Sequence, residues 1–420
     1  MKSLALDDAG LLQADGPAQK LPPKERAVLR LLLERAPGVV RKDEFAAQAW
    51  AGRLMSDESL ARCISRVRQL LQPRGVKVEA VYGLGYRLVD GAAPAAPGTA
   101  ALDSYAHARQ LQQQRTPAAM GLAIELLRTL VRDEPGFASA RVALADALAI
   151  SVGWGQLATL SAVEEGLAAL EDLDGSLPGL QAARGSLLDM AWRFGEARQC
   201  FEQALAQDGD GIDALFGFAR HLIYTDAAGE AIEKLRRVRQ LAPHAVHVRM
   251  MLTRALVQSG RGAEAVAEAR GAVNDHPGLL VMVAFSLAIQ AMVEPHAELE
   301  AAALRLTQGL EAPPFVWTVS AFVLSRLGRR EATLDIVDTA LLCSSTTAGE
   351  AALYAAPLAA LGEYERAGAL LRAAVDERCG MMAMVLRDPA HAHWLPRHPA
   401  GQALLREVFG SSVESGIGRK

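Results

Sequence analysis

The chain has 420 residues, which is enough for two or more domains with sizeable hydrophobic cores. Half of its residues are hydrophobic and only 5% are aromatic, a composition that favours helices over sheets. The net charge of −4 excludes a chain that binds nucleic acid along its whole length, but residues 1–90 hold 15 Lys and Arg against 11 Asp and Glu, whereas residues 91–420 hold 29 against 37. A basic N-terminal part on an acidic body is typical of a protein that meets phosphate at one end.

Neither disulfides nor a membrane span is expected. The four cysteines at positions 63, 200, 343 and 379 are far apart and form no C-x-x-C pair, so we predict reduced thiols. The longest apolar run, 279–293, is 15 residues long, whereas a bilayer span needs about 20. Acidic residues at positions 7 and 8 stand where a signal peptide would be apolar. We therefore predict a soluble, cytoplasmic protein with no cofactor and no metal.

The first predicted domain, residues 1–90, ends in a helix followed by a hairpin. Between residues 59 and 71, Leu60, Ile64, Val67 and Leu71 recur at helical spacing, so one face of this helix is expected to lie on a core. Residues 77–81 and 85–89 indicate two short strands around a glycine-rich turn. A helix and a hairpin beside a three-helix pattern indicate a winged helix, which places a helix in the major groove of DNA and its hairpin near the backbone.

A linker is predicted at residues 91–103, because GAAPAAPGTA at 91–100 consists of small residues and prolines. Residues 104–410 are then predicted to form one domain of repeats. Most copies share a short motif in which a glycine comes just before the glutamate and an alanine follows it, as at 195–197 and 229–231. The repeated glutamates, at intervals of 33 or 34 residues, are Glu196, Glu230, Glu264, Glu298, Glu331 and Glu365.

This period indicates a helix, a glycine turn and a second helix, repeated along the chain. Glycine suits the turn because it accepts a positive φ and lets helices approach closely, and a glutamate near a helix start is favoured by the helix dipole. The pattern resembles the tetratricopeptide repeat, and we expect about six to eight helix pairs between roughly residues 104 and 380. Residues 387–409 are expected to cap the stack. The predicted fold class is therefore mainly α, with an N-terminal winged helix (α+β) followed by an α-solenoid of tetratricopeptide-like helix pairs.

Residues 21–89 resemble the DNA-binding domain of response regulators of the OmpR/PhoB type. The motifs that carry this resemblance are LPPKE at 21–25, PGVVRKDEF at 37–45, Trp50, ISRVR at 64–68 and VYGLGYRL at 81–88. Residues 3–20 stand where that family has an N-terminal sheet, which is shortened here. The resemblance implies sequence-specific binding of double-stranded DNA and control of transcription. The predicted DNA-binding residues are Lys42, Ser59, Arg62, Ser65, Arg66, Arg68, Tyr82 and Arg87.

The resemblance implies different roles within this set. It places the polar helix face around Arg62, Ser65 and Arg66 at the bases or nearby phosphates, and Lys42, Ser59 and Arg68 near phosphates. Arg68 lies on the flank of that face, where an ion pair is an equal alternative. Tyr82 replaces an arginine that is common in the family, so no minor-groove arginine contact is expected there, although its hydroxyl is suited to donate to a phosphate.

Simpler structural interpretations stand beside these roles. Arg62 and Arg66 could lie on a solvated helix face, with Arg66 reaching an acid. Trp50 is expected to pack in the core, and Tyr86 to plug the wing. The histidines at 391, 393 and 398 surround Trp394, and here a packed capping segment is favoured over a metal site.

A DNA-binding module placed before the repeats, without a receiver domain, resembles one-component regulators of the CadC and HilA kind. We predict a bacterial transcription regulator that binds promoter DNA. It is not expected to be an enzyme, because the chain has no H-E-x-x-H, G-x-S-x-G, Walker A or G-x-G-x-x-G motif. The alternative is a helical-repeat interaction scaffold whose winged helix is not a DNA reader.

The repeats are expected to mediate self-association into a homodimer, or to bind RNA polymerase, a regulatory protein or a small ligand, and no contact with a membrane is expected. The candidate residues for a concave binding surface are Arg220, His221, Tyr224, Arg249 and Arg254.

Overall fold

The computed structural model describes residues 5–6, 11–13, 19–36, 38–50, 52, 55–71, 76–81, 84–90, 97–307, 313–342 and 346–410. The chain forms two compact units, Met1–Gly98 and Thr99–Lys420, each with hydrophobic core residues of its own. Helix α4 (Thr99–Gln114) begins inside the predicted linker, which reached residue 103. The reason is that proline and glycine end at Gly98, and helix-forming alanine and leucine follow.

The N-terminal unit opens with a short antiparallel sheet of order β1-β2-β3. Its strands are β1 (Ala5–Leu6), β2 (Leu11–Gln13) and β3 (Gln19–Lys20). The shortened sheet that we expected from residues 3–20 is therefore present.

Three helices and a second sheet complete this unit. The helices are α1 (Pro23–Arg35), α2 (Lys42–Gln48) and α3 (Asp57–Leu71), and the strands are β4 (Val40–Arg41), β5 (Val76–Val81) and β6 (Gly85–Asp90). Strands β5 and β6 form an antiparallel hairpin, and β4 pairs with the outer side of β6. This is the predicted winged helix.

The core of the N-terminal unit lies between α1, α3 and the hairpin. The predicted stripe Leu60, Ile64, Val67 and Leu71 is buried together with Phe45 of α2 and aliphatic side chains of α1. Tyr86 of β6 packs edge-on against Phe45, with ring centroids 6.1 Å apart, as expected of a plug of the wing. Trp50 is buried too, and its ring lies 5.2 Å from the Lys24 Nζ.

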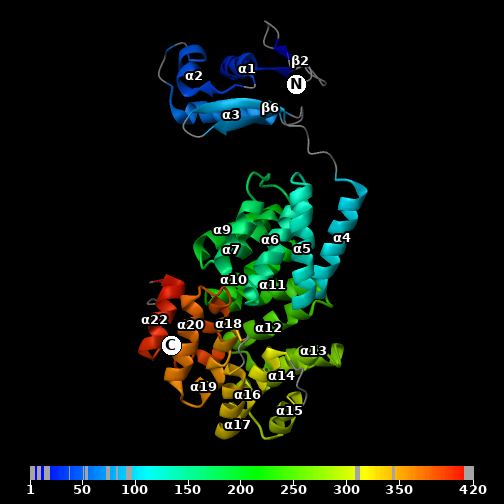
Figure 1. Cartoon of the computed structure of the whole chain (residues 1–420), viewed down its shortest axis with the longest axis vertical. Helices are drawn as coiled ribbons and strands as arrows, with labels where there is room; N and C mark the ends of the chain where they lie inside the picture. The colour runs from blue at the N-terminus through cyan, green and yellow to red at the C-terminus, as the bar shows by residue number, and fades with distance from the viewer. Residues whose placement is uncertain are drawn as a thin grey trace. The chain divides into compact units, whose positions relative to one another are not determined.

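The second unit is a stack of helix pairs in chain order (Figure 1). Its described residues form eight such pairs, counting α18 and α19 together as one first helix, and a C-terminal segment follows. The first four are α4 with α5 (Pro117–Asp133), α6 (Ala138–Gly153) with α7 (Thr159–Ala169), α8 (Leu180–Met190) with α9 (Phe194–Gln207), and α10 (Ile212–Tyr224) with α11 (Ala228–Leu241). The others are α12 (Val246–Gln258) with α13 (Gly262–Asp275), α14 (Leu280–Val293) with α15 (Glu298–Leu306), α16 (Pro314–Arg326) with α17 (Arg330–Leu341), and α18 (Ala348–Ala352) and α19 (Ala355–Ala360) with α20 (Tyr364–Asp376).

All six repeated glutamates lie where the sequence predicted, in the first turn of the second helix of their pair. The helix dipole favours a negative charge at this position. Two of them also bind an arginine three residues earlier, since Arg193 pairs with Glu196 and Arg261 with Glu264, each at 2.6 Å.

The prediction for the turn glycines is only partly right. The residue with positive φ recurs in steps of 34 or 68 residues, at Trp192, Asp226, Gly260, Gly328 and Gly362. In the first three of these repeats the motif glycine, which is Gly195, Gly229 or Gly262, comes two or three residues later and lies inside the second helix. The left-handed residue is needed just after the first helix, where the chain must turn, and Trp192, Asp226 and Gly260 take that position in those three copies.

A C-terminal segment follows α20 and consists of α21 (Met382–Leu386), the 3-10 turn η2 (Pro389–His391) and α22 (Pro399–Phe409). Leu404 and Leu405 of α22 are buried with Leu371 of α20, so this segment caps the last repeat as predicted. The Trp394 Nε1 donates to the His391 Nδ1 at 3.0 Å within the cap. Among the described side chains, no group of three or more His, Cys, Asp or Glu could hold a metal ion.

The C-terminal segment also packs against helices far earlier in the chain. The Gly380 N–H donates to the Thr159 Oγ1 at 2.9 Å, and the Phe409 ring stacks on Phe194 with centroids 5.5 Å apart. The Arg254 Nη2 of α12 donates to the Asp388 Oδ2 at 2.7 Å. The stack of repeats therefore closes on itself through its last residues. No helix within the described ranges is long and apolar enough to cross a bilayer.

Candidate nucleic-acid interface

Helix α3 presents a polar face to solvent because its apolar stripe is fixed in the core. Arg62, Ser65 and Arg66 are exposed, and Ser59 in the first turn is half-buried. The helix start is fixed by Ser56, whose Oγ accepts a hydrogen bond from the Ser59 N–H at 3.2 Å. The structure thus brings four of the predicted residues together on one helix.

The two arginines one turn apart have different surroundings. Arg62 donates to Glu58 on the same helix at 2.9 Å, and both side chains are more than 70% exposed. Arg66 is 68% exposed, but its Nη1 donates at 2.8 Å to the Oε1 of Glu25, whose side chain is only 6% exposed. The interpretation that Arg66 reaches an acid therefore holds, and that acid is a buried residue of α1.

Arg68 lies on the flank of the same helix and joins it to the wing. Its Nε donates to the Val78 carbonyl of β5 at 2.9 Å. This bond is neither the phosphate contact nor the ion pair considered from the sequence, and it leaves the Nη atoms at the end of the exposed side chain.

Arg87 on the wing faces an acid on the neighbouring strand. The register of the hairpin places Glu79 directly opposite Arg87. The Arg87 Nε and Nη2 both donate to the Glu79 Oε2, at 3.0 and 2.8 Å, and both side chains are about half exposed. This cross-strand pair offsets the charge of Arg87 at the wing.

Lys42 lies next to the turn of the wing. It is the first residue of α2 and is exposed, and its backbone N–H donates to the Leu84 carbonyl at 3.2 Å. This approach depends on Gly85, since a Cβ there would lie 1.9 Å from the Val40 carbonyl oxygen. The start of α2 and the wing turn, far apart in sequence, therefore form one edge. Tyr82, which we also predicted to bind DNA, lies outside the described residues.

Three acidic residues at this site were missed by the sequence analysis. Glu25, Glu58 and Glu79 each hold an arginine of the predicted set. Glu58 and Glu79 had a sequence signal, because Glu58 lies four residues before Arg62 on one helix, and the predicted strands 77–81 and 85–89 place Glu79 opposite Arg87. Glu25 belongs to the LPPKE motif, but nothing in that motif indicates its partner 41 residues later.

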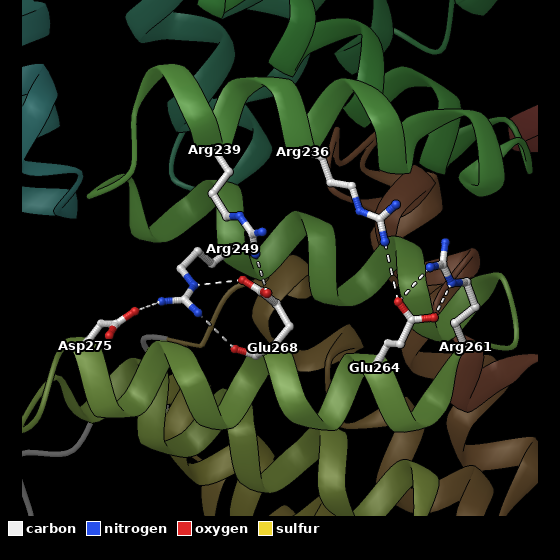
Figure 2. A network of polar contacts seen from close by, with 7 residues as sticks. All are labelled: Arg236, Arg239, Arg249, Arg261, Glu264, Glu268 and Asp275. Atoms are coloured by element: carbon white, nitrogen blue, oxygen red, sulfur yellow. Dashed lines mark hydrogen bonds and ion pairs between the residues drawn. The ribbon is translucent and has the colours of Figure 1, made fainter.

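Most of the candidate residues for a concave binding surface on the repeats do not form one. His221 and Tyr224 are buried, and the His221 Nδ1 lies 2.7 Å from the Asp189 Oδ1. Arg249 is buried between α12 and α13 in the network that Figure 2 shows, where its Nε donates to the Glu268 Oε1 at 2.8 Å. These predictions were wrong because α10 and α12 are packed on several sides, so helical spacing alone does not separate core from surface.

The N-terminal unit has a family likeness. Residues 16–88 match the family described as "Transcriptional regulatory protein, C terminal". This match covers α3 and the wing together. The Transcriptional regulator HilA of Salmonella typhimurium is 39% identical over 82 residues, and the same values hold for HilA of Salmonella typhi. These residues make up 19% of this chain and 15% of those proteins, so the chain covers only a small part of these relatives.

The second unit is similar to other repeat proteins. Residues 222–279 match the tetratricopeptide repeat family. Among solved structures, a tetratricopeptide repeat protein from Parabacteroides merdae gives a TM-score of 0.41 at 13% identity, covering 61% of this chain and 98% of that one. The APC/C hetero-tetramer Cut9–Hcn1 gives 0.44 at 15% identity, covering 69% of this chain and 52% of that one.

Proposed function

We propose that this protein is a transcription regulator that binds specific double-stranded promoter DNA through its N-terminal unit. The observation that carries the proposal is the exposed face of α3, which presents Arg62, Ser65 and Arg66 beside a wing while the opposite face is buried. A helix of this kind fits the major groove, where arginine pairs in a bidentate manner with guanine. The likeness of residues 16–88 to transcriptional regulatory proteins supports the same function.

The proposed contacts divide into base reading and backbone positioning. Arg66 and Arg62 read base edges, with Ser65 between them. Lys42, Ser59 and the Nη atoms of Arg68 contact phosphates on either side, as do Arg87 and Tyr82 from the wing. Lys42 and the wing turn are joined by the hydrogen bond to Leu84, so they grip the backbone as one edge.

The repeats have a different proposed role. A single winged helix buries a modest area on DNA, so two copies on neighbouring half-sites give tighter and more specific binding. We assign the repeats to self-association or to a protein partner such as RNA polymerase. The families matched by the two units are not enzyme families, and we propose no catalysis. A bacterial protein with this function acts in the cytoplasm, where the DNA is.

The test is DNA selection with the full chain, followed by affinity measurements at several salt concentrations. Arg66→Ala should weaken binding to the selected duplex by about 1–3 kcal/mol and relax the choice of sequence, because it removes a base contact. Lys42→Ala should weaken binding to every sequence and lower the salt slope by about one. If the parent chain enriches no sequence and both variants bind DNA as it does, the assigned face is wrong and an interaction scaffold is the better description.

A further inference from the structure

We propose that Glu25 is a positioning residue that fixes the guanidinium of Arg66 for reading bases, so that it governs sequence discrimination without touching DNA. The inference rests on the proposed function. Arg66 would then be held by an acid from α1, the helix that packs behind α3.

Glu25 is a buried acid on α1. Its carboxylate lies in the first turn of α1, is almost fully buried and, among the residues that the structure describes, forms an ion pair with Arg66 of α3 at 2.8 Å. A buried carboxylate is costly unless a cation or hydrogen-bond donor satisfies it. The nearby Cys63 adds no second negative charge, because burial, and then the Glu25 carboxylate itself, raises the pKa of its thiol. The Arg66 guanidinium is therefore held at the inner edge of the exposed face.

Arg66 is anchored at one end of its guanidinium. Only its Nη1 is engaged by Glu25, while the side chain as a whole is 68% exposed. A guanidinium is planar and carries five donors in a fixed fork, so anchoring one nitrogen orients the whole plane. The outward donors are then fixed in direction before DNA arrives. Such preorganisation lowers the entropy cost of a specific contact.

Arg62 provides the contrast within the same helix. Its partner Glu58 is 78% exposed and lies one turn earlier on α3. Exposed pairs of this kind are weak and exchange readily with solvent. Glu58 and Glu25 each place one negative charge beside a predicted DNA-contacting arginine, but only Glu25 is buried enough to fix the arginine that it binds. Glu58 is therefore a matched control for charge.

Neutralising Glu25 should change the affinity for unrelated DNA and the affinity for the selected sequence in opposite directions. Neutralising either glutamate removes a charge that repels phosphate, so affinity for unrelated DNA should rise slightly in both variants. Neutralising Glu25 should in addition release Arg66, so affinity for the selected sequence should fall. A residue that only supported the fold would lower both affinities together.

The experiment compares the full chain with Glu25→Gln and Glu58→Gln, measuring affinity for the selected duplex and for an unrelated duplex of equal length. Glu25→Gln should lower the ratio of these two affinities by about fivefold to tenfold, as expected for one misdirected bidentate contact. Glu58→Gln should change the ratio by less than about twofold. Retained binding to the unrelated duplex shows that the Glu25→Gln variant is folded.

A double variant separates positioning from other effects. In an Arg66→Ala background, Glu25→Gln should leave the ratio unchanged, because the residue that it positions is gone. The inference is overturned if the parent prefers the selected duplex and Glu25→Gln keeps the full ratio, or if the loss persists without Arg66. A parent chain that shows no preference at all overturns the proposed function instead.

Discussion

His391 lies inside the C-terminal cap, where its Nδ1 accepts a hydrogen bond from the Trp394 Nε1. Burial lowers the pKa of His391 from 6.5 to about 4, and His393 and Arg254 add to this, while the Asp388 carboxylate opposes it. The folded protein thus keeps this ring neutral at a pH where the unfolded chain would protonate it. The neutral nitrogen is the one that accepts the Trp394 hydrogen bond.

This burial predicts that acid weakens the fold. Between pH 6.5 and about 4 the unfolded state binds the extra proton, so the free energy of unfolding should fall as the pH is lowered, by up to about 1.4 kcal/mol per pH unit from this group. Above pH 7 the group should have no effect. His391→Asn keeps an acceptor for Trp394 and does not titrate, so its urea midpoints at pH 7 and pH 5 should differ less than those of the parent. Equal falls in the two proteins would contradict the prediction.

The positions of single residues at the candidate DNA-binding face were largely predictable, and their partners were not. Helical spacing placed Arg62, Ser65 and Arg66 on the exposed side of α3 because the opposite stripe is strongly apolar. The partner of Arg66 lies 41 residues away on another helix, and the sequence around either residue carries no trace of the contact. Such tertiary pairs depend on how helices pack, which one sequence does not reveal.

At the scale of the elements, several helix pairs have a residue in the left-handed conformation at the turn between their two helices. Glycine occupies this position at Gly328 and Gly362, where φ is 73° and 81°, whereas Asp226 adopts it at 66°. Residues with a Cβ resist this conformation, and aspartate tolerates it better than most. The motif glycines of α9 and α11 have no such role, since neither Gly195 nor Gly229 has a positive φ, and a Cβ at either would meet open space.

Two alanine substitutions should therefore have opposite effects. Gly362→Ala should destabilise the protein by about 1 kcal/mol, because it forces alanine into the left-handed region. Gly229→Ala lies within α11 and should be neutral or stabilising by up to about 1 kcal/mol, since alanine favours a helix more than glycine does. Chemical denaturation of both variants checks the sign. A loss of stability in Gly229→Ala equal to that in Gly362→Ala would show that the two glycines are equivalent after all.

The helix pairs themselves were predictable because their period of 34 residues is explicit in the sequence. Which side chains within each pair are buried was harder to predict. In α10, His221 and Tyr224 are buried along with the apolar residues around them, so polar character did not mark the surface. His221 is satisfied by Asp189 from α8, a pairing between two repeats that their common period does not disclose.

At the scale of the whole second unit, the C-terminal segment ties the last repeat to the middle of the stack. Arg254 of α12 is the main polar tie, because its Nη2 donates both to the Asp388 Oδ2 at 2.7 Å and to the Met384 carbonyl at 2.8 Å. Its side chain is 14% exposed and that of Asp388 is 25% exposed, so water has little access to this ion pair. An ordinary open solenoid has contacts only between neighbouring repeats.

Loss of this tie should destabilise the unit strongly. Arg254→Ala takes the cation away from the partly buried Asp388 carboxylate, which keeps its hydrogen bond from the Ala390 N–H, and it takes a donor away from the Met384 carbonyl. This change should cost about 2–3 kcal/mol. Arg270→Ala is the control, because Arg270 is exposed and its partner within the described ranges is the neutral Gln290 side chain. It should cost less than about 0.5 kcal/mol. Urea denaturation of both variants distinguishes them. Similar losses would mean that the C-terminal tie contributes no more than an ordinary surface contact.

The hydrogen bond between Gly380 and Thr159 spans 221 residues, and it has a consequence for how the protein is made. At about 5–20 residues per second, a ribosome needs roughly 10–45 s to produce Gly380 after Thr159 has been added. During that interval the apolar ends of α6 and α8, around Val152 and Met190, lack Gly380, which later packs against them. The nascent chain therefore exposes these apolar residues until Gly380 has been added, an interval that favours binding by chaperones.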